Sequence, residues 1–239
     1  MPQFFIDSSD IVDGIVKISG NDFHHLVKVR RVAPGDKVAL RRTDGIGCEA
    51  KILSVHSTYL SAFIEKEYPA GTEFLYLTVY LSILKGANFE LALQKCVEIG
   101  VSEIIPVISE RTIPNLRDRA DQKTLRWKKI VFESAKQCLR ENVPVLSYPV
   151  DFKTAIADAA GEIKLLAHPD SNRPIKSVLR ENNPPASADL LIGPEGGFSS
   201  KELNIAEEMG WTTVNAGVNH LRGETAAIVI PSIILYEWI

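Results

Sequence analysis

Residues 190–199 read Leu190-Leu191-Ile192-Gly193-Pro194-Glu195-Gly196-Gly197-Phe198-Ser199. An apolar run that stops at glycines and a proline predicts a buried strand followed by an open turn. Glycine loses much conformational entropy on folding, so its repeated use indicates a sharp bend or a ligand that approaches the main chain closely. We therefore expect a pocket at the end of this strand.

A second polar turn follows, Asn219-His220-Leu221-Arg222-Gly223-Glu224-Thr225-Ala226, and opens an apolar helix expected over 224–238. Two such turns in one α/β unit predict one pocket with two rims. Arg222 beside a glycine is suited to binding a phosphate or carboxylate group. Glu224 has two explanations, a functional carboxylate or a favourable charge at a helix N-terminus.

The glycine-rich turn does not match the common nucleotide-binding motifs. It is not G-x-G-x-x-G, and no Gly-Lys-Ser/Thr sequence follows it, so the usual NAD and ATP sites are disfavoured. The simpler alternative is a tight turn before a helix capped by Ser199. Glu195 argues against that alternative, because such a turn has no need of a carboxylate between Pro194 and Gly196.

Residues 1–70 predict a small β-barrel. Short strands are expected at 14–19, 37–41, 47–55 and 59–66, with turns at Pro34-Gly35-Asp36 and Asp44-Gly45 between them. Closely spaced strands with such turns are typical of barrels. Residues 21–29 predict a helix, with Asn21 or Asp22 as its N-cap.

Residues 71–239 predict a second domain, in which strands alternate with helices. Strands are expected at 74–84, 101–108, 164–168, 189–192 and 211–216, and helices at 88–99, 121–140, 200–209 and 224–238. Ser199-Ser200-Lys201-Glu202 has the pattern of a capping box, which places a helix start there, and Gly100 is a natural stop for the helix 88–99. The alternation predicts an α/β fold with a parallel sheet.

Composition excludes several classes of protein. The chain has 239 residues, of which 45% are hydrophobic and 24% charged, a composition typical of one or two soluble domains. It has no apolar run long enough to span a membrane. The N-terminus lacks a signal-peptide pattern. Cys48, Cys96 and Cys138 form no C-x-x-C pair, and the histidines show no zinc-site spacing, so we expect neither disulfides nor a metal. The cytoplasm is the expected location.

The net charge of −3 hides two basic stretches. Between His24 and Arg42 the single acidic residue is Asp36, and residues 111–140 hold nine basic side chains against three acidic ones. Such stretches predict contact with a polyanion such as RNA; the alternative is a pair of solvated helix faces. The candidate RNA-binding residues are His24, His25, Lys28, Arg30, Arg31, Arg111, Arg126, Lys129 and Arg140.

Motifs along nearly the whole chain, taken in order, resemble the RsmE family of 16S ribosomal RNA uridine-N3 methyltransferases. The N-terminal motif is His24-His25-Leu26-Val27-Lys28-Val29-Arg30-Arg31-Val32 with Pro34-Gly35-Asp36. The central ones are Lys85-Gly86, residues 95–107, Ser109-Glu110-Arg111-Thr112, residues 126–130, and residues 133–138 with Arg140. Residues 192–199 and 221–227 complete the series.

The resemblance implies a PUA-like β-barrel followed by a SPOUT-type α/β domain with a C-terminal trefoil knot. It also implies a homodimer that binds S-adenosylmethionine in the knot loops, mostly through backbone groups. Transferred by motif, the cofactor-binding residues are His168, Ile192, Gly193, Glu195, Gly197, Ala216, Gly217, Leu221 and Arg222.

Some positions depart from the family pattern. Ala216-Gly217-Val218-Asn219-His220 stands where a Leu-Gly-Pro-Arg-Ile run is usual, and Gly223 where Thr or Val is usual. Leu139 and Glu141 stand near positions where small or basic residues are common. The missing Pro-Arg pair affects the shape of this loop and one RNA contact.

The function implied is methylation of uridine N3 in 16S rRNA, within the small ribosomal subunit. Because N3–H must lose its proton, a base is needed, and Glu224 or Glu195 are the candidates. Arg222 is expected to stabilise charge on a uracil carbonyl. The alternatives are a non-catalytic RNA-binding protein on the same scaffold, or a SPOUT enzyme acting on another RNA such as transfer RNA.

Overall fold

The computed structural model describes residues 4–71, 74–112, 120–217 and 219–239. The chain divides into two compact units. Unit 1 is Met1–Thr72 with Ala135–Val143, and unit 2 is Glu73–Ser134 with Pro144–Ile239. The assignment of separate functions to 1–70 and 71–239 stays a prediction. The basic residues Arg117 and Arg119 of the stretch 111–140, and Val218 of the second turn, lie outside the described residues.

Unit 1 contains a curled six-stranded sheet with the order β1-β4-β5-β6-β3-β2. The strands are β1 (Phe5–Ile6), β2 (Ile11–Val12), β3 (Ile15–Ser19), β4 (Lys37–Arg42), β5 (Gly47–Val55) and β6 (Tyr59–Tyr68). Their alternating pattern turns Val16, Leu40 and Leu60 into one apolar core. The four predicted strands are therefore confirmed. Strands β1 and β2, which have two residues each, were not predicted.

The predicted helix of unit 1 is present, but its predicted cap is wrong. Helix α1 (Gly20–His24) continues into a π-helical segment, His25–Val29, and its N-cap is Ser19, which makes no side-chain capping bond. Asp22 instead forms an ion pair of 2.5 Å with Lys136. The carboxylate expected to cap the helix is thus used by a residue more than a hundred positions away, which local sequence cannot show.

Residues 135–143 belong to unit 1 although the segments before and after them in the chain, Glu73–Ser134 and Pro144–Ile239, belong to unit 2. Glu141 accepts the Gly71 N–H at 3.0 Å and lies 3.6 Å from the Arg41 guanidinium. A side chain on Gly71 would collide with the Glu141 carboxylate. Glu141, one of the departures from the family pattern, therefore has structural partners in this chain.

Unit 2 contains a sheet with the order β10-β8-β7-β12-β11-β13, and β9 beside β8. The strands are β7 (Tyr76–Ser82), β8 (Glu103–Ile108), β9 (Val145–Leu146), β10 (Val150–Asp151), β11 (Ile163–Ala167), β12 (Ser187–Ile192) and β13 (Thr212–Val214). Their described pairings are parallel, as predicted. The helices are α2 (Ala87–Ile99), α3 (Ala120–Gln137), α4 (Phe152–Asp158), α5 (Ile175–Glu181), α6 (Ser200–Glu208) and α7 (Gly223–Trp238). The end of α3, from Ala135, belongs to unit 1.

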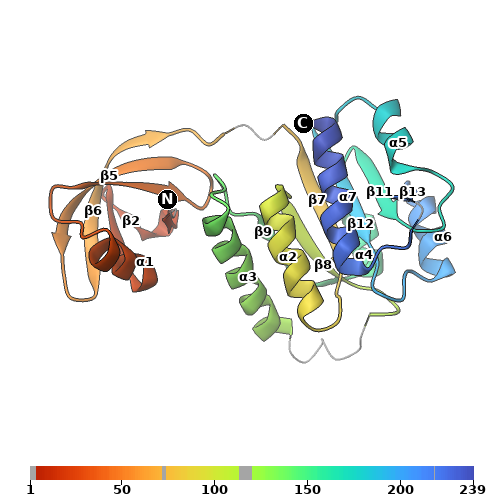
Figure 1. Ribbon diagram of the computed structural model, residues 1–239, viewed down its shortest axis with the longest axis horizontal. Coiled ribbons are helices and arrows are strands. Elements are labelled where there is room, and N and C mark those ends of the chain that lie inside the picture. Colours follow the sequence, from red (N-terminus) through yellow and green to blue (C-terminus); the bar gives the residue numbers. More distant parts are fainter. Residues whose placement is uncertain (1–3, 72–73, 113–119, 218) are drawn as a thin grey trace. The chain divides into compact units, whose positions relative to one another are not determined.

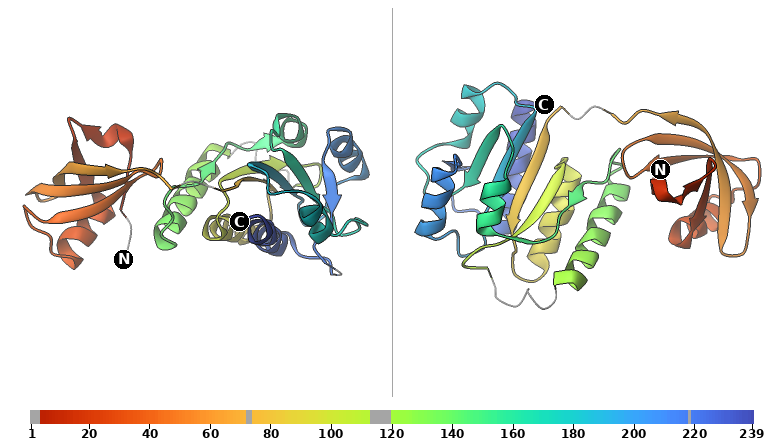
Figure 2. Two further views of the ribbon diagram at one scale, coloured as in Figure 1. Left: turned by 90° about the horizontal axis from the view of Figure 1, so that it is seen from above. Right: turned by 180° about the vertical axis from the view of Figure 1, so that it is seen from behind.

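Helices cover both faces of this sheet. Figure 1 and Figure 2 show α2, α5 and α7 on one face and α4 and α6 on the other. On the second face, Tyr80, Phe152 and Trp211 belong to one buried cluster. On the first, the Cys96 thiol of α2 lies 3.4 Å from the Ala227 carbonyl of α7. Both faces of β12 are consequently buried, which explains its continuous apolar sequence.

Two predicted helix boundaries are confirmed by their geometry. Gly100 ends α2 with a left-handed φ of 118°, and Ser199 and Glu202 form the capping box of α6. Helices α4 and α5 were not predicted, and each has only seven residues. Across the described ranges, no helix is both long enough and apolar enough to cross a bilayer.

The parallel pairing decides where a ligand can bind. Since all these strands run the same way, the segments that follow β7, β8, β11, β12 and β13 emerge at one edge of the sheet. The two glycine-containing turns singled out in the sequence are among these segments.

Burial of Asp189 in β12 makes the stability of unit 2 depend on pH. Asp189 is 3% exposed, and burial raises the pKa of its carboxyl, while the N–H of Gly161, which it accepts at 2.7 Å, opposes the shift. The folded state therefore binds more protons than the unfolded state above about pH 4, the ordinary pKa of aspartate. The stability of the folded state therefore falls as pH rises through the pKa that Asp189 has in that state.

We expect Asp189→Asn to remove this loss while its amide oxygen keeps the bond to Gly161. Denaturant unfolding from about pH 4 to neutrality, an interval that starts at the ordinary aspartate pKa, should show the variant gaining stability relative to wild type as pH rises. An identical pH dependence in both proteins would contradict the explanation.

Candidate functional site

One cavity lies at this edge of the sheet, with a volume of about 870 Å³. That volume is in the range of sites for small organic ligands. Its walls come from the segments after five strands: Lys85 and Asn88, Arg111, residues 167–170, residues 192–198, and Val214, Ala216, Gly217 and residues 219–224. The predicted pocket with two rims is therefore present as a single space in unit 2.

The first rim is the glycine-rich loop after β12. Gly197 has a left-handed φ of 65°, and its N–H donates to the Pro194 carbonyl at 2.8 Å, which closes a tight turn. A β-carbon at Gly193 would lie 3.1 Å from the Phe198 ring. Gly197 is thus required by its backbone conformation and Gly193 by its close packing. Because these residues lack side chains, the loop leaves main-chain groups facing the cavity.

Glu195 has a partner that the sequence did not reveal. Its carboxylate accepts the backbone N–H of Lys85, after β7, at 2.7 Å. The side chain therefore ties the loop after β12 to the loop after β7. This contact explains a carboxylate in a turn that does not itself need one.

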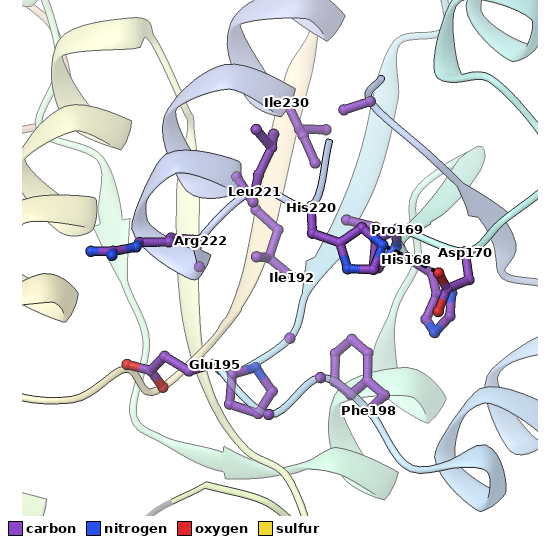
Figure 3. Close-up of a pocket in the computed structure, with 18 of the residues that line it drawn as sticks. His168, Pro169, Asp170, Ile192, Glu195, Phe198, His220, Leu221, Arg222 and Ile230 are labelled. Carbon is purple, nitrogen blue, oxygen red and sulfur yellow. Dashed lines mark ion pairs between the residues drawn. The ribbon is translucent and has the colours of Figure 1, made fainter. Parts of the chain in front are cut away.

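The second rim is formed by Ala216, Gly217 and residues 219–222. Gly217 has a φ of 150°, again in the range that favours glycine. His220 Nε2 lies 3.4 Å from a carboxylate oxygen of Asp170, and both side chains are about 70% exposed. Figure 3 shows this pair, with His168 and Pro169, gathered at one end of the cavity.

Charged groups lie at the other end. Arg222 is the exposed N-cap residue of α7, and Figure 3 shows its guanidinium on the same side of the cavity as Glu195. Glu224, in the first turn of α7, has a buried Oε2 atom with no hydrogen-bond partner in the described part of the chain. A buried carboxylate oxygen without a partner is costly, so this atom marks a place where a ligand would complete the site.

Apolar side chains form the wall between the two ends. They are Ile192, Phe198, Leu203, Leu221 and Ile230. An apolar wall with exposed backbone and charged ends fits a ligand that has both an aromatic ring and charged groups. The described residues contain no cluster of side chains that could hold a metal ion.

The structure brings every predicted cofactor and catalytic candidate to this one cavity. His168, Ile192, Gly193, Glu195, Gly197, Ala216, Gly217, Leu221, Arg222 and Glu224 all line it. Their individual roles stay predictions. Sequence reasoning missed Asn88 and Asp170 as lining residues, and it noted Lys85 only as part of a motif.

The RNA-binding candidates are divided between the two units. His24, Lys28, Arg30 and Arg31 are exposed in unit 1, where His25 and Arg140 are half-buried. In unit 2, Lys129 is exposed, whereas Arg126 is paired with Glu90 at 2.7 Å. Arg111 lines the cavity, and its guanidinium donates to the Gly196 carbonyl at 2.6 Å.

Two family models match the chain. Residues 72–235 match the model described as an RNA methyltransferase domain, and residues 18–65 match an RNA methyltransferase PUA domain. The first match covers most of unit 2 and includes both rims of the cavity.

Individual proteins agree with these matches. The chain is 36% identical over 151 residues to ribosomal RNA small subunit methyltransferase E of Mesomycoplasma hyopneumoniae, an alignment covering 63% of this chain and 65% of that relative. It is 29% identical to the Bacillus subtilis protein of the same name, over 92% of this chain and 89% of that protein. A crystal structure of the Neisseria gonorrhoeae protein bound to S-adenosyl methionine has a TM-score of 0.85 and 29% identity, covering 100% of this chain and 98% of that one.

Gly223, where a larger residue was expected, has a steric explanation. A β-carbon there would lie 2.7 Å from Cδ2 of Leu84, which is buried. We expect Gly223→Val to lower the free energy of unfolding by about 1–3 kcal/mol, the usual cost of overpacking. Denaturant unfolding of this variant, of Leu84→Ala and of the double variant measures the coupling. The double variant should be more stable than the sum of the single effects predicts, and strict additivity would contradict the steric explanation.

Proposed function

Because the chain belongs to the RNA methyltransferase family, we propose that it transfers a methyl group from S-adenosylmethionine to N3 of a uridine in 16S ribosomal RNA. The observation that carries the proposal is the convergence of all predicted cofactor residues on one cavity. A protein of the same architecture over its whole length has been crystallised with S-adenosyl methionine. This likeness supports the choice of cofactor for the present chain.

The cavity suits this cofactor. The apolar wall of Ile192, Phe198 and Leu221 would hold the adenine ring, and main-chain groups of the two rims would hold the polar parts. S-adenosylmethionine supplies an activated methyl group on a positively charged sulfur. The carboxylate of Glu224, with its unpartnered buried oxygen, suits a site that receives a cation.

Proton removal from uridine N3 requires a base near Arg222, at the charged end of the cavity. Glu195 already accepts the Lys85 N–H through one carboxylate oxygen, whereas one oxygen of Glu224 has no partner among the described residues. Glu224 is therefore the better candidate to accept the N3 proton. Arg222 would then stabilise the negative charge that develops on a uracil carbonyl oxygen.

The exposed basic residues of unit 1 would bind the surrounding RNA. Lys28, Arg30 and Arg31 follow one another closely after α1, in the region matched by the PUA model. Contacts of this kind bind phosphate groups and fix the orientation of the RNA. The target uridine must be unpaired or flipped out of a helix, because pairing occupies N3. The RNA would be bound as part of the small ribosomal subunit, in the cytoplasm.

We further propose that the protein works as a homodimer through α7. One side of α7 is buried in unit 2. The helix also carries Ile228 and Ile233, which are half-buried, and Tyr236, which is 86% exposed. An apolar surface of this kind on one helix favours burial against a second copy. The trefoil knot implied by the family resemblance stays part of the proposal.

Methylation of purified small subunits tests the function. Subunits from a strain that lacks the modification, incubated with the protein and labelled S-adenosylmethionine, should gain 3-methyluridine in 16S rRNA, mapped by nucleoside mass spectrometry. No label would indicate a non-catalytic RNA-binding protein. Label only in transfer RNA would indicate another substrate.

In the same assay, Arg222→Ala should lower the methylation rate about a hundredfold, as expected for loss of one charge-stabilising donor, with little change in cofactor affinity. Arg173→Ala, an exposed arginine outside the cavity lining, is the matched control and should methylate normally. Equal losses of rate and cofactor affinity in Arg222→Ala would contradict its assigned role.

A further inference from the structure

The turn after β8, Ser109–Thr112, is held in a fixed shape by its own hydrogen bonds. The Thr112 N–H donates to the Ser109 carbonyl, and the Ser109 N–H donates to the Thr112 hydroxyl, both at 3.0 Å. Both residues are buried. The two residues between them, Glu110 and Arg111, are exposed and reach the glycine-rich loop after β12.

Arg111 contacts the middle of that loop. Its guanidinium donates to the Gly196 carbonyl at 2.6 Å, and a β-carbon on Gly196 would lie 3.3 Å from Arg111 Cδ. The Gly196 carbonyl and the Gly197 N–H belong to the same planar peptide unit. That N–H closes the turn onto Pro194. By fixing the carbonyl, Arg111 therefore fixes the direction of the N–H as well.

Glu110 contacts the end of the loop. Its carboxylate accepts the Ser199 hydroxyl at 2.8 Å, and its backbone N–H donates to the Glu202 carboxylate at 2.8 Å. Glu202 is 6% exposed and forms the capping box with Ser199. The turn 109–112 thus holds the loop at two points, and the bond from Lys85 to Glu195 holds it at a third.

We propose that Arg111 is a positioning residue that keeps the glycine-rich loop in the shape that binds S-adenosylmethionine, and that it is not a phosphate contact for RNA. This inference rests on the proposed function, since the cofactor is the ligand of that loop. A loop rich in glycine samples many conformations, and a charge-assisted hydrogen bond to its central peptide selects one of them. Cofactor affinity should therefore depend on Arg111 even without RNA.

The test measures two affinities separately. Calorimetry gives the affinity for S-adenosylmethionine without RNA, and a salt series gives the affinity for purified small-subunit rRNA. Arg111→Ala should bind the cofactor about tenfold or more weakly, as expected for a lost charge-assisted bond. Arg111→Lys keeps the stem and one donor and should recover part of the loss. The salt dependence of RNA binding should match that of wild type in both variants.

Arg30→Ala is the matched comparison, because Arg30 is an exposed arginine of unit 1. It should reduce the slope of RNA affinity against salt by about one and leave cofactor affinity unchanged. Wild-type cofactor affinity in Arg111→Ala, or a salt slope reduced as in Arg30→Ala, would overturn the inference. If Arg111→Ala does not fold, Arg111→Lys takes its place in the test, and a cofactor affinity equal to that of wild type in this variant would also overturn the inference. A wild-type protein that binds no cofactor would instead refute the proposed function.

Discussion

Parallel hydrogen bonding of β12 between β7 and β11 is the constraint on which the site depends. Because the three strands run in one direction, the segments after Ser82, Ala167 and Ile192 emerge at the same edge. Strand β13 adds its own following segment on the far side of β11. Residues separated by more than a hundred positions, such as Lys85 and Glu195, thereby become hydrogen-bond partners.

The loops at this edge have main-chain groups that can bind a ligand, and side chains from other loops hold them in one conformation. The segment 193–197 contains three glycines and forms no strand or helix, so main-chain groups other than the bonded Pro194 and Gly196 carbonyls and Gly197 N–H can face a ligand. Such a segment would be mobile by itself, because glycine restricts the chain least. Side chains from other loops, Arg111 and Glu110 among them, supply the restriction that the loop sequence lacks. Pre-organisation of this kind reduces the entropy lost on ligand binding.

Much of the fold could be predicted from local sequence. The apolar run ending at Ile192, the capping box at Ser199 and the stop at Gly100 depend on neighbouring residues, and each is confirmed. Features that depend on distant partners were missed. Asp22 does not cap its helix because Lys136 pairs with it, and residues 135–143 belong to unit 1 through contacts with residues far away in sequence.

The same distinction applies to the site. The glycines of 193–197 stood out because they indicate a bend or a closely approaching ligand, Glu195 because the turn does not need a carboxylate, and Arg222 because it suits binding of an anionic group. All of them line the cavity. The family resemblance, not spacing, assigned the cofactor. The basic character of residues 111–140 placed Arg111 among the RNA contacts, since charge alone does not distinguish a phosphate contact from a bond to a carbonyl. The hydrogen bond to Gly196, on which the proposed positioning role rests, depends on the neighbouring loops after β8 and β12 and has no signal in local sequence.

A crystal structure of this protein grown with S-adenosylhomocysteine, the demethylated product of the cofactor, would show whether the two rims form the cofactor site. We expect the ligand between the two rims, with its ring against Ile192 and Leu221 and its polar groups on main-chain atoms of residues 193–197, 216–217 and 219–221. A cavity that stays empty at saturating ligand, or a ligand bound elsewhere on the chain, would contradict this expectation.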